Sequence, residues 1–513
     1  MVELRESDRT GHDFPPRADR WVGLAVLSAC MFLVGMDLTV LNVAAPTLSR
    51  LLLPSRVELL WILDAYSLAV AAFVVTCGTV GDRIGRKRML LFGLAVFGIG
   101  SLGAAFAQSP LQLIVARAVL GVGAAAIMAT AVAVIRVIFT SREDRTFAIG
   151  LWAAGHSVGA AGGPILGGFL VEHFWWGSVF LVNVPIVVAS LFLAWRVIPE
   201  SRDRAPRRWD PLSVVLSVAG VGGLLYWLKR LGGYGFETTA CVVGLFALAA
   251  LVAFIRRQRR LAQPLLDLSL FADRHFSVPV GCVLAGFGST PAMLFLLTQK
   301  FQLLDGWSPL SAGLGLVPWT AASGIGGTVA PLLARHVGHR SAMTGGLGLF
   351  AASLAAVGLA SSSAGHAIFE ILLALAGLGL GVAMPLAGDT MMSAATAERA
   401  GEAAAVQEIS FELGAALGIV VLDTFASITY RTLLPAISGV PTAAHDAAGE
   451  SLGAAAAAAG GLPHRAAAAL LAAARYAFMT GFRNAALLAA VVAAGTAVVS
   501  AYLLRGRHGG VNT

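Results

Sequence analysis

Ionisable side chains lie inside strongly apolar stretches of this sequence, where they could exchange protons or attract a charged ligand. Asp37, Asp64 and Arg117 each fall within such a stretch. A charge inside a membrane span costs about 2.5 to 3.5 kcal/mol on insertion scales, so it is a candidate functional group by default. At 1.5 Å per residue all three lie in the outer half of their spans. Arg117 could pair with either acid until a ligand or a conformational change separates them, and a permanent structural ion pair is the alternative.

A second set of acids lies later in the chain. Glu408 and Glu412 are four residues apart in a predicted helix, so they share one helix face. Two like charges in a low dielectric disfavour each other's ionised form, which favours proton exchange near neutral pH. A later start of that helix would instead leave Glu408 at the membrane interface. Glu402 and Asp389 are expected at the interface, and Asp423 lies deep in the span without a motif to support a role.

Glycines recur at every fourth residue in one apolar stretch. Gly155, Gly159 and Gly163 therefore lie along one helix face, where a neighbouring backbone can approach closely. Pro164 removes a backbone donor and is expected to bend the helix. Such a span could hinge, and ordinary small-residue packing is the alternative. The match of Gly155-His-Ser-Val-Gly159 to a hydrolase nucleophile elbow is discounted, because that elbow needs a strand-to-helix turn on a soluble sheet.

The composition places these residues in a membrane protein. Of 513 residues, 57% are hydrophobic and 12% are charged, with a mean hydropathy of +0.80. Soluble domains usually carry about 25% charged residues. The net charge of +8 comes from short basic clusters between apolar runs, which argues against a nucleic-acid partner. No disulfide framework or metal site is expected, because four cysteines lie unpaired in apolar runs, at Cys30, Cys77, Cys241 and Cys282.

Apolar runs long enough to span a bilayer, about 18 residues or more, organise the whole chain. We predict an all-α polytopic membrane protein with 14 transmembrane helices. The runs lie near 20–46, 57–79, 89–107, 110–135, 147–170, 175–197, 211–230, 238–256, 275–301, 310–333, 341–361, 366–391, 403–430 and 482–504. The polar N-terminal segment shows no cleavable signal peptide, so the first span is expected to direct insertion.

Lys and Arg residues gather in alternate connecting segments, as cytoplasmic loops require. We therefore predict a multi-pass protein of the plasma membrane with two cytoplasmic tails, residues 1–19 and 505–513. The largest outer segment, 432–480, is rich in Ala and Gly. It is interpreted either as a helix lying on the outer surface or as a variable loop.

A faint internal repeat suggests how the spans are grouped. The turn Ala334-Arg-His-Val-Gly-His-Arg340 has a glycine followed by basic residues, as Gly85-Arg-Lys-Arg88 does, but it lacks the aspartate found at 82. We predict two six-helix bundles, at 20–197 and 275–504, with a helix pair inserted at 211–256. Repeats of this kind place the substrate site at their interface.

Four motifs in the first five spans carry a family resemblance. They are Met36-Asp-Leu-Thr-Val-Leu-Asn-Val-Ala-Ala-Pro46, Gly81-Asp-Arg-Ile-Gly-Arg-Lys87, Arg117-Ala-Val-Leu-Gly-Val-Gly123 and Gly159-Ala-Ala-Gly-Gly-Pro-Ile-Leu-Gly-Gly168. Together they resemble the major facilitator superfamily, specifically its fourteen-span drug:proton antiporter branch, which includes the quaternary-ammonium export pumps. The resemblance weakens after the fifth span.

The resemblance implies roles for individual residues. Coupling of protons and substrate is assigned to Asp37, Asp64, Arg117, Glu408 and Glu412. A cytoplasmic ion-paired latch that stabilises the outward-open state is assigned to Gly81, Asp82, Arg83, Gly85, Arg86 and Lys87, although the basic residues could serve membrane topology alone. An antiporter hinge is assigned to Gly155, Gly159, Gly163, Pro164, Gly167 and Gly168. The segment Trp61-Ile-Leu-Asp-Ala-Tyr66 resembles the second span of quaternary-ammonium exporters and favours cationic substrates.

These roles predict a proton-coupled exporter that works by alternating access. A deprotonated carboxylate attracts a lipophilic cation, and protonation from outside releases it. Stacking or cation–π contacts could come from Trp61, Tyr66, Trp152 and Phe411. The sequence lacks a phosphate-binding G-x-x-x-x-G-K-[ST] loop, so we expect the proton motive force to drive transport, with no cofactor, in a monomer. An exporter of an endogenous metabolite or antibiotic would use the same motifs, whereas an importer, a membrane enzyme or a receptor is less favoured.

Overall fold

A computed structural model describes residues 17–139, 141–202, 210–234, 237–261, 268–360, 366–395 and 400–505. These residues form helices and connecting turns, with no strand among them. The helices of the N-terminal half are α1 (Arg17–Leu52), α2 (Arg56–Ile84), α3 (Arg86–Ala105), α4 (Pro110–Ile138), α5 (Arg142–His173), α6 (Ser178–Leu181), α7 (Asn183–Val197), α8 (Pro211–Tyr234) and α9 (Thr238–Gln258).

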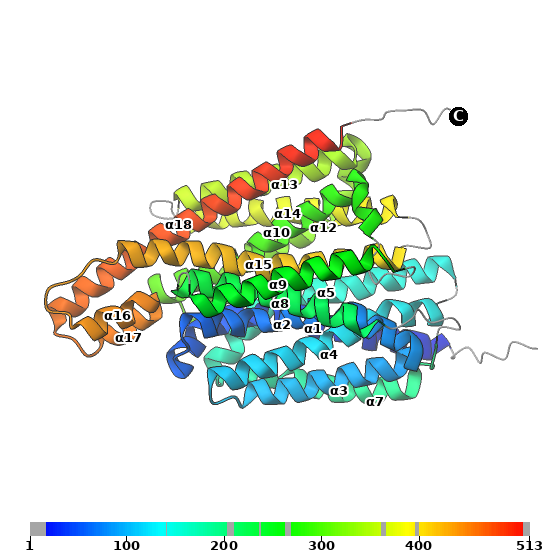
Figure 1. Cartoon of the computed structure of the whole chain (residues 1–513), viewed down its shortest axis with the longest axis horizontal. Helices are drawn as coiled ribbons and strands as arrows, with labels where there is room; N and C mark the ends of the chain where they lie inside the picture. The colour runs from blue at the N-terminus through cyan, green and yellow to red at the C-terminus, as the bar shows by residue number, and fades with distance from the viewer. Residues whose placement is uncertain are drawn as a thin grey trace, which may run out of the picture.

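The C-terminal half continues the all-helical pattern with two short irregular helices, η1 and η2. Its elements are η1 (Leu268–Ala272), α10 (Arg274–Gln299), η2 (Lys300–Leu304), α11 (Pro309–Gly315), α12 (Val317–Val337), α13 (His339–Ala360), α14 (His366–Ala394), α15 (Ala400–Leu433), α16 (Thr442–Glu450), α17 (Leu452–Ala459) and α18 (His464–Leu503). Figure 1 shows the long helices running side by side along the molecule.

Twelve helical segments of the described chain are long and apolar enough to cross a membrane. They fall in α1, α2, α3, α4, α6–α7, α9, α10, α11–α12, α13, α14, α15 and α18. The predicted spans at 147–170 and 211–230 correspond to α5 and α8, which are not among the twelve. The all-α polytopic fold is therefore confirmed, whereas the count of fourteen spans stays a prediction.

The same packing pattern occurs twice. In the first half α1 packs against α5 and α7, α2 against α4, and α3 against α4 and α7. In the second half α10 packs against α15 and α18, α12 against α14, and α13 against α14 and α18. The repeat that the sequence shows faintly is thus plain in the packing. The residue boundaries of the two predicted bundles stay predictions.

The turns that follow α2 and α12 are equivalent in this repeat. Gly85 separates α2 from α3 with φ +116°, and Gly338 separates α12 from α13 with φ +84°. Side chains rarely adopt these angles, which explains why a glycine recurs here although the neighbouring residues differ. Asp82 precedes the first turn and has no counterpart before the second, so the turn conformation does not depend on this aspartate.

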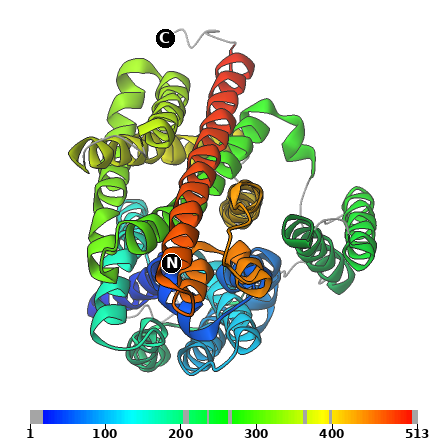
Figure 2. The ribbon, with the colours of Figure 1, turned by 90° about the vertical axis from the view of Figure 1, so that its left-hand side faces the viewer.

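The α8–α9 pair lies to one side of both halves (Figure 2). The helix α8 packs against α2 of the first half and α15 of the second. Near the chain entry to α8, Asp210 accepts hydrogen bonds from the Arg257 guanidinium of α9 at 2.8 and 2.9 Å and from the Ser213 hydroxyl at 2.6 Å. These bonds hold the two helices together and lower the pKa of Asp210 to about 2.

The predicted outer segment 432–480 contains helices in the structure. Two short helices, α16 and α17, fold back beside the bundle, and α18 already begins at His464 (Figure 1). At 1.5 Å per residue, the 40 residues of α18 extend about 60 Å, twice the hydrocarbon thickness. The end of the bundle that carries α16 and α17 is called the outer end below, following the predicted orientation.

Candidate transport site

The guanidinium of Arg117 joins three helices inside the first half. Arg117 of α4 is 1% exposed and forms an ion pair with Asp37 of α1, which is 0% exposed. It also donates hydrogen bonds to the carbonyl oxygens of Ile62 at 3.2 Å and Leu63 at 3.4 Å, both on α2. The predicted acid Asp64 follows Leu63 directly and is 1% exposed. Of the two possible acidic partners, the structure pairs Arg117 with Asp37.

Aromatic rings complete the surroundings of this cation. The ring centroid of Tyr66 lies 4.8 Å from the Arg117 guanidinium carbon, and that of Phe180 lies 6.0 Å from it. The Tyr66 hydroxyl donates to the carbonyl oxygen of Val34 at 3.5 Å and so ties α2 to α1. A buried arginine is tolerated when a carboxylate, carbonyls and ring faces share its charge. Protonation of Asp37 would remove the negative partner and leave the neutral ones in place.

The other predicted aromatic contacts lie at helix junctions. Phe411 of α15 contacts Phe287 of α10, with ring centroids 4.4 Å apart. Trp61 of α2 lies 6.1 Å from Tyr226 of α8. Trp152 is half-buried in α5. The rings of Phe411 and Trp61 therefore lie at separate helix junctions.

The predicted hinge glycines face α1 along most of α5. A methyl group on Gly155 would lie 2.6 Å from the Ser28 carbonyl oxygen, and one on Gly159 would overlap the Phe32 carbonyl. Gly163 and Gly167 meet α1 in the same way, at Met36 and Val40. The hydroxyl of Thr39 donates to the Ala160 carbonyl at 2.9 Å across this contact. The glycine stripe thus brings two backbones into direct contact.

The last part of the same motif instead meets the second half of the molecule. A methyl group on Gly168 would lie 2.6 Å from the Pro309 carbonyl oxygen. A methyl group on Gly313 of α11 would overlap the Pro164 carbonyl oxygen. Glu172, at the end of α5, accepts a hydrogen bond from the Leu310 backbone amide at 3.1 Å. The helix α5 runs unbroken through Pro164. The predicted hinge therefore links the two halves at the outer end.

The charged turn between α2 and α3 forms its ion pair within itself. Asp82 accepts two hydrogen bonds of 3.0 Å from the Arg86 guanidinium, four residues later. Glu200, beyond α7, accepts a 3.2 Å bond from the Lys87 backbone amide and lies 3.6 Å from the Arg88 guanidinium. The turn is therefore also held by an acid that the motif does not contain, whereas its role as a latch stays a prediction.

Gly85 explains why Glu200 reaches this turn. A methyl group on Gly85 would overlap the Glu200 carboxylate, and the Arg86 amide donates to the Ser201 carbonyl at 2.9 Å. Gly81 packs on Met89 and Thr130, whereas Arg83 is exposed. Sequence reasoning missed Glu200, although an isolated acid directly after the sixth apolar run was a signal that could have identified it.

The acids of the second half are only partly described. Positions 408 and 412 lie in the first half of α15, four residues apart on one continuous helix. The side chains of Glu408 and Glu412 lie outside the described residues, as does that of Glu402. Asp389, at the end of α14, contacts His339 at 3.0 Å and is 58% exposed, in agreement with an interfacial position.

Comparison with known proteins decides the family. The sequence profile of the Major Facilitator Superfamily matches residues 27–419. The chain belongs to this family.

Relatives within the superfamily cover between 82% and 94% of the chain. The multidrug efflux pump LfrA of Mycolicibacterium smegmatis is 38% identical over 94% of this chain and 96% of its own length. The methyl viologen resistance protein SmvA of Salmonella typhimurium is 37% identical over 90% of this chain and 93% of its own. The tetracenomycin C resistance and export protein of Streptomyces glaucescens is 30% identical, with shares of 82% and 78%.

Solved structures of the superfamily share the fold at low identity. An inward-facing bacterial homologue of the lysosomal transporter Spinster matches with a TM-score of 0.67 and 16% identity, covering 95% of this chain and 98% of that one. The D-xylose–proton symporter matches with a TM-score of 0.59 and 14% identity, covering 79% and 90%. This chain is therefore a multi-pass membrane protein built on the transporter fold of its superfamily.

Proposed function

We propose that this protein exports lipophilic, cationic compounds in exchange for protons. The observation that carries the proposal is the buried Asp37–Arg117 pair, because it places an acid that a proton can neutralise between three helices of the bundle. Export is supported by the relatives, which are named as efflux, resistance and export proteins. A cationic substrate is supported by SmvA, since methyl viologen is an aromatic dication.

The proposed cycle uses acids in both halves. With its carboxylates ionised, the inward-open protein binds a cation from the cytoplasm or the inner leaflet near Glu408 and Glu412. After the molecule opens outward, protons entering from outside neutralise the acids and release the cation. Asp37 loses its attraction for Arg117 when protonated, so the contact among α1, α2 and α4 would change with the state of the cycle.

We also propose the topology that this cycle requires. The helices α5 and α8 have 32 and 24 residues, enough to cross a bilayer, and would bring the number of spans to fourteen. Both termini would then be cytoplasmic in the plasma membrane, and the protein would act as a monomer without a cofactor. Fusion of alkaline phosphatase and of green fluorescent protein after residue 505 tests this, because only the fluorescent fusion would be active at a cytoplasmic C-terminus.

Ethidium efflux from cells that express the chain tests the function. We expect efflux that a protonophore abolishes, and loss of it in Asp37→Asn and Glu408→Gln. Asp446→Asn is the control, because this acid on α16 has a side chain that is 75% exposed. Protonophore-insensitive efflux would contradict antiport. Well-expressed parent protein without efflux of ethidium or methyl viologen would contradict cation export.

A dedicated exporter of an endogenous metabolite or antibiotic is the second candidate. It is favoured by the similarity to the tetracenomycin C resistance and export protein, over 82% of this chain. Efflux of a panel of cationic, neutral and anionic aromatic compounds separates the two. A broad response among cations supports the first candidate, whereas a response to one neutral or anionic aromatic compound alone supports the second.

A further inference from the structure

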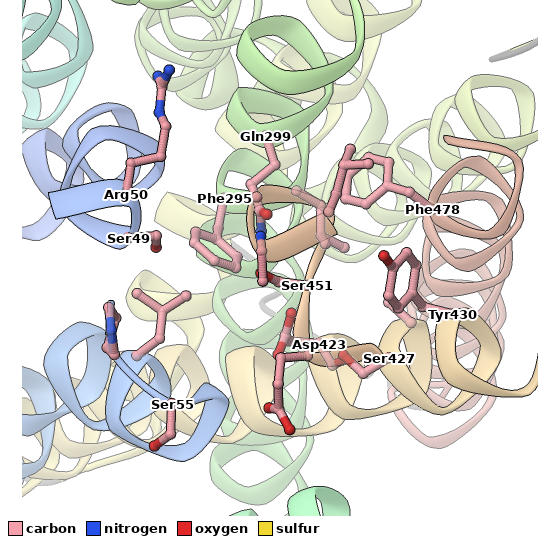
Figure 3. A pocket seen from close by; sticks show the side chains of 18 of the residues that line it. Ser49, Arg50, Ser55, Phe295, Gln299, Asp423, Ser427, Tyr430, Ser451 and Phe478 are labelled. Atoms are coloured by element: carbon pink, nitrogen blue, oxygen red, sulfur yellow. The ribbon is translucent and has the colours of Figure 1, made fainter. Parts of the chain in front are cut away.

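A cavity of about 410 Å³ lies at the outer end, where the two halves meet. Its walls come from the ends of α1 and α2 that face each other, from α10, α15 and α18, and from the folded-back helices α16 and α17. Figure 3 shows Asp423, Ser427 and Tyr430 along one helix, with Phe295 and Phe478 on neighbouring elements. This volume lies within the range of small-molecule pockets, roughly 300 to 1,000 Å³.

The charges on the walls favour a cation. Three acids line the cavity, Glu58, Asp423 and Glu450, against one base, Arg50, among its described lining residues. Glu450 is neutralised by an ion pair of 3.4 Å with Arg431, outside the wall. The other two acids, Glu58 and Asp423, line the same cavity as Arg50. Asp423 is only 6% exposed, so its carboxylate acts in a site with little water.

Aromatic side chains supply the rest of a binding site for an organic cation. Phe295, Tyr430, Phe478 and Phe482 line the cavity from three different helices. The Tyr430 hydroxyl donates to the Ala448 carbonyl of α16 at 2.9 Å, which fixes this ring and holds α16 over the cavity. Ring faces next to a carboxylate bind aromatic and quaternary cations by stacking and cation–π attraction.

The position of Asp423 on α15 relates this cavity to the predicted coupling acids. Residues 412 and 423 are 11 positions apart, about three helical turns or roughly 16 Å, and so lie on nearly the same face of α15. A cation that leaves the neighbourhood of position 412 toward the outer end would follow this face. Asp423, which belongs to no sequence motif, thus lies where an exported cation would pass.

We propose that the cavity is a second binding site for aromatic monovalent cations, with Asp423 as the counter-charge and the aromatic rings as its walls. In this proposal the cavity receives the substrate after the substrate leaves the predicted coupling acids Glu408 and Glu412. This inference rests on the proposed function for the identity of the cation, but its charge preference can be measured without transport.

Cysteine labelling tests the charge preference directly. Ala457 lines the cavity and is exposed, whereas its neighbour Ala456 is exposed but does not line it. In a Cys241→Ser background, Ala457→Cys and Ala456→Cys are treated with trimethylammonium-ethyl and sulfonatoethyl methanethiosulfonate. We expect the cation-to-anion rate ratio to be about tenfold higher at 457 than at 456, as one nearby charge in a medium of intermediate dielectric allows. Ethidium should slow labelling at 457 only.

The variant Asp423→Asn should reduce the rate ratio at 457 to that at 456 and abolish protection by ethidium, and Asp423→Glu should retain both. If Ala457→Cys does not fold, Ala447→Cys, which also lines the cavity, replaces it, with exposed Ala443→Cys as its control. Equal ratios at both sites, or protection that survives Asp423→Asn, would overturn the proposal.

Efflux measured on the same variants separates the two proposals. Parent protein that exports ethidium but shows no charge preference at 457 would contradict the outer site and leave the function standing. Charge-selective, ethidium-protected labelling without efflux would contradict the function and leave the outer site standing. With both in place, we expect Asp423→Asn to raise the ethidium concentration for half-maximal efflux by about tenfold.

Discussion

The contacts of Arg117 determine how the loss of the Asp37 charge would affect stability and efflux. Asp37 supplies the one carboxylate in the described hydrogen bonds of this guanidinium, and both residues are almost fully buried. Removing one member of a buried pair typically costs about 3 to 5 kcal/mol, because the remaining charge is left uncompensated. We therefore expect Asp37→Asn to lower the free energy of unfolding by that order and to abolish efflux.

A double-mutant cycle separates structure from coupling at this pair. Arg117→Gln together with Asp37→Asn removes both charges, so we expect thermal stability in detergent to recover by at least about 1 kcal/mol relative to Asp37→Asn alone. Efflux should stay absent, because the titratable carboxylate at position 37 is gone. Recovery of efflux in the double variant would show that the pair is purely structural.

The sequence predicted how deep Asp37, Asp64 and Arg117 lie in the membrane, but not which acid pairs with the arginine. Asp37 and Asp64 lie at similar heights, and the height of Arg117 suits both. The choice depends on which helix faces turn toward α4, and one sequence does not contain that information. The position of Glu200 after the sixth apolar run marks it in the sequence, but its partner does not follow from that position, since its contact with Lys87 joins residues 113 positions apart.

Among the helices, α5 depends on the absence of side chains at one face. A methyl group on Gly159 would overlap the Phe32 carbonyl of α1, whereas one on Gly162 would meet nothing within 4 Å. We expect Gly159→Ala to separate α1 from α5, lowering stability by about 1 to 3 kcal/mol and reducing efflux, as overpacking does. Gly162→Ala is the matched control and should resemble the parent in thermal unfolding. Equal behaviour of the two variants would contradict the contact.

The α8–α9 pair depends on one ion pair near its predicted inner end. Asp210 has its pKa lowered to about 2 by its bonds with Arg257 and Ser213, against a usual value of 3.8. A lowered pKa means that the stabilisation is complete above the usual value and is lost as the pH falls toward 2. Thermal stability should therefore show no contribution from this pair to pH dependence between pH 5 and 8.

Neutralising the base of this pair provides the test. We expect Arg257→Gln to lower the thermal unfolding temperature, because Asp210 loses the hydrogen bonds that this guanidinium donates. Arg256→Gln, its exposed neighbour on α9, should change stability little. A loss in Arg256→Gln as large as that in Arg257→Gln would refute the assigned role of the Asp210 contact.

The lengths of the apolar runs predicted most of the spans, but they did not predict where the helices begin and end. The last span was expected to begin at 482, yet α18 begins at His464. Its first turns contain Arg465 and Arg475 among alanines. Alanine favours a helix in any solvent, while hydropathy detects only the portion that suits a lipid environment. The folded-back helices α16 and α17 were likewise invisible to a search for apolar runs.

At the scale of the whole molecule, the two halves meet through equivalent helices. The helix α2 packs against α15, and α5 packs against α11 and α12, which is the arrangement that the internal repeat requires. Movement of one half against the other must therefore break contacts at one end of these pairs while others persist. The α5–α11 contact lies at the outer end, so it has to open before a substrate leaves there.

Glu172 provides a pH-dependent part of this outer contact. Hydrogen bonds from Ser308 and the Leu310 amide lower the pKa of this carboxyl below its usual value of 4.5. Because the ionised form makes these bonds, they are complete above that pH and weaken as the pH falls below it. We expect the outer ends of α5 and α11 to separate more often in acid, and Glu172→Gln to separate them at neutral pH.

Spin labels at exposed Phe174→Cys and Leu314→Cys measure that separation by pulsed electron resonance. The long-distance population should rise in Glu172→Gln at pH 7 and should then lose its response to pH near 4, because the titrating group is gone. Glu370→Gln, an exposed acid on α14, is the control and should keep the parent response. A parent protein whose distances do not change between pH 7 and 4, or a Glu172→Gln variant that still responds to acid, would show that another group controls the outer contact. A response confined to the parent and the control would identify Glu172 as the residue through which external protons loosen the outer end.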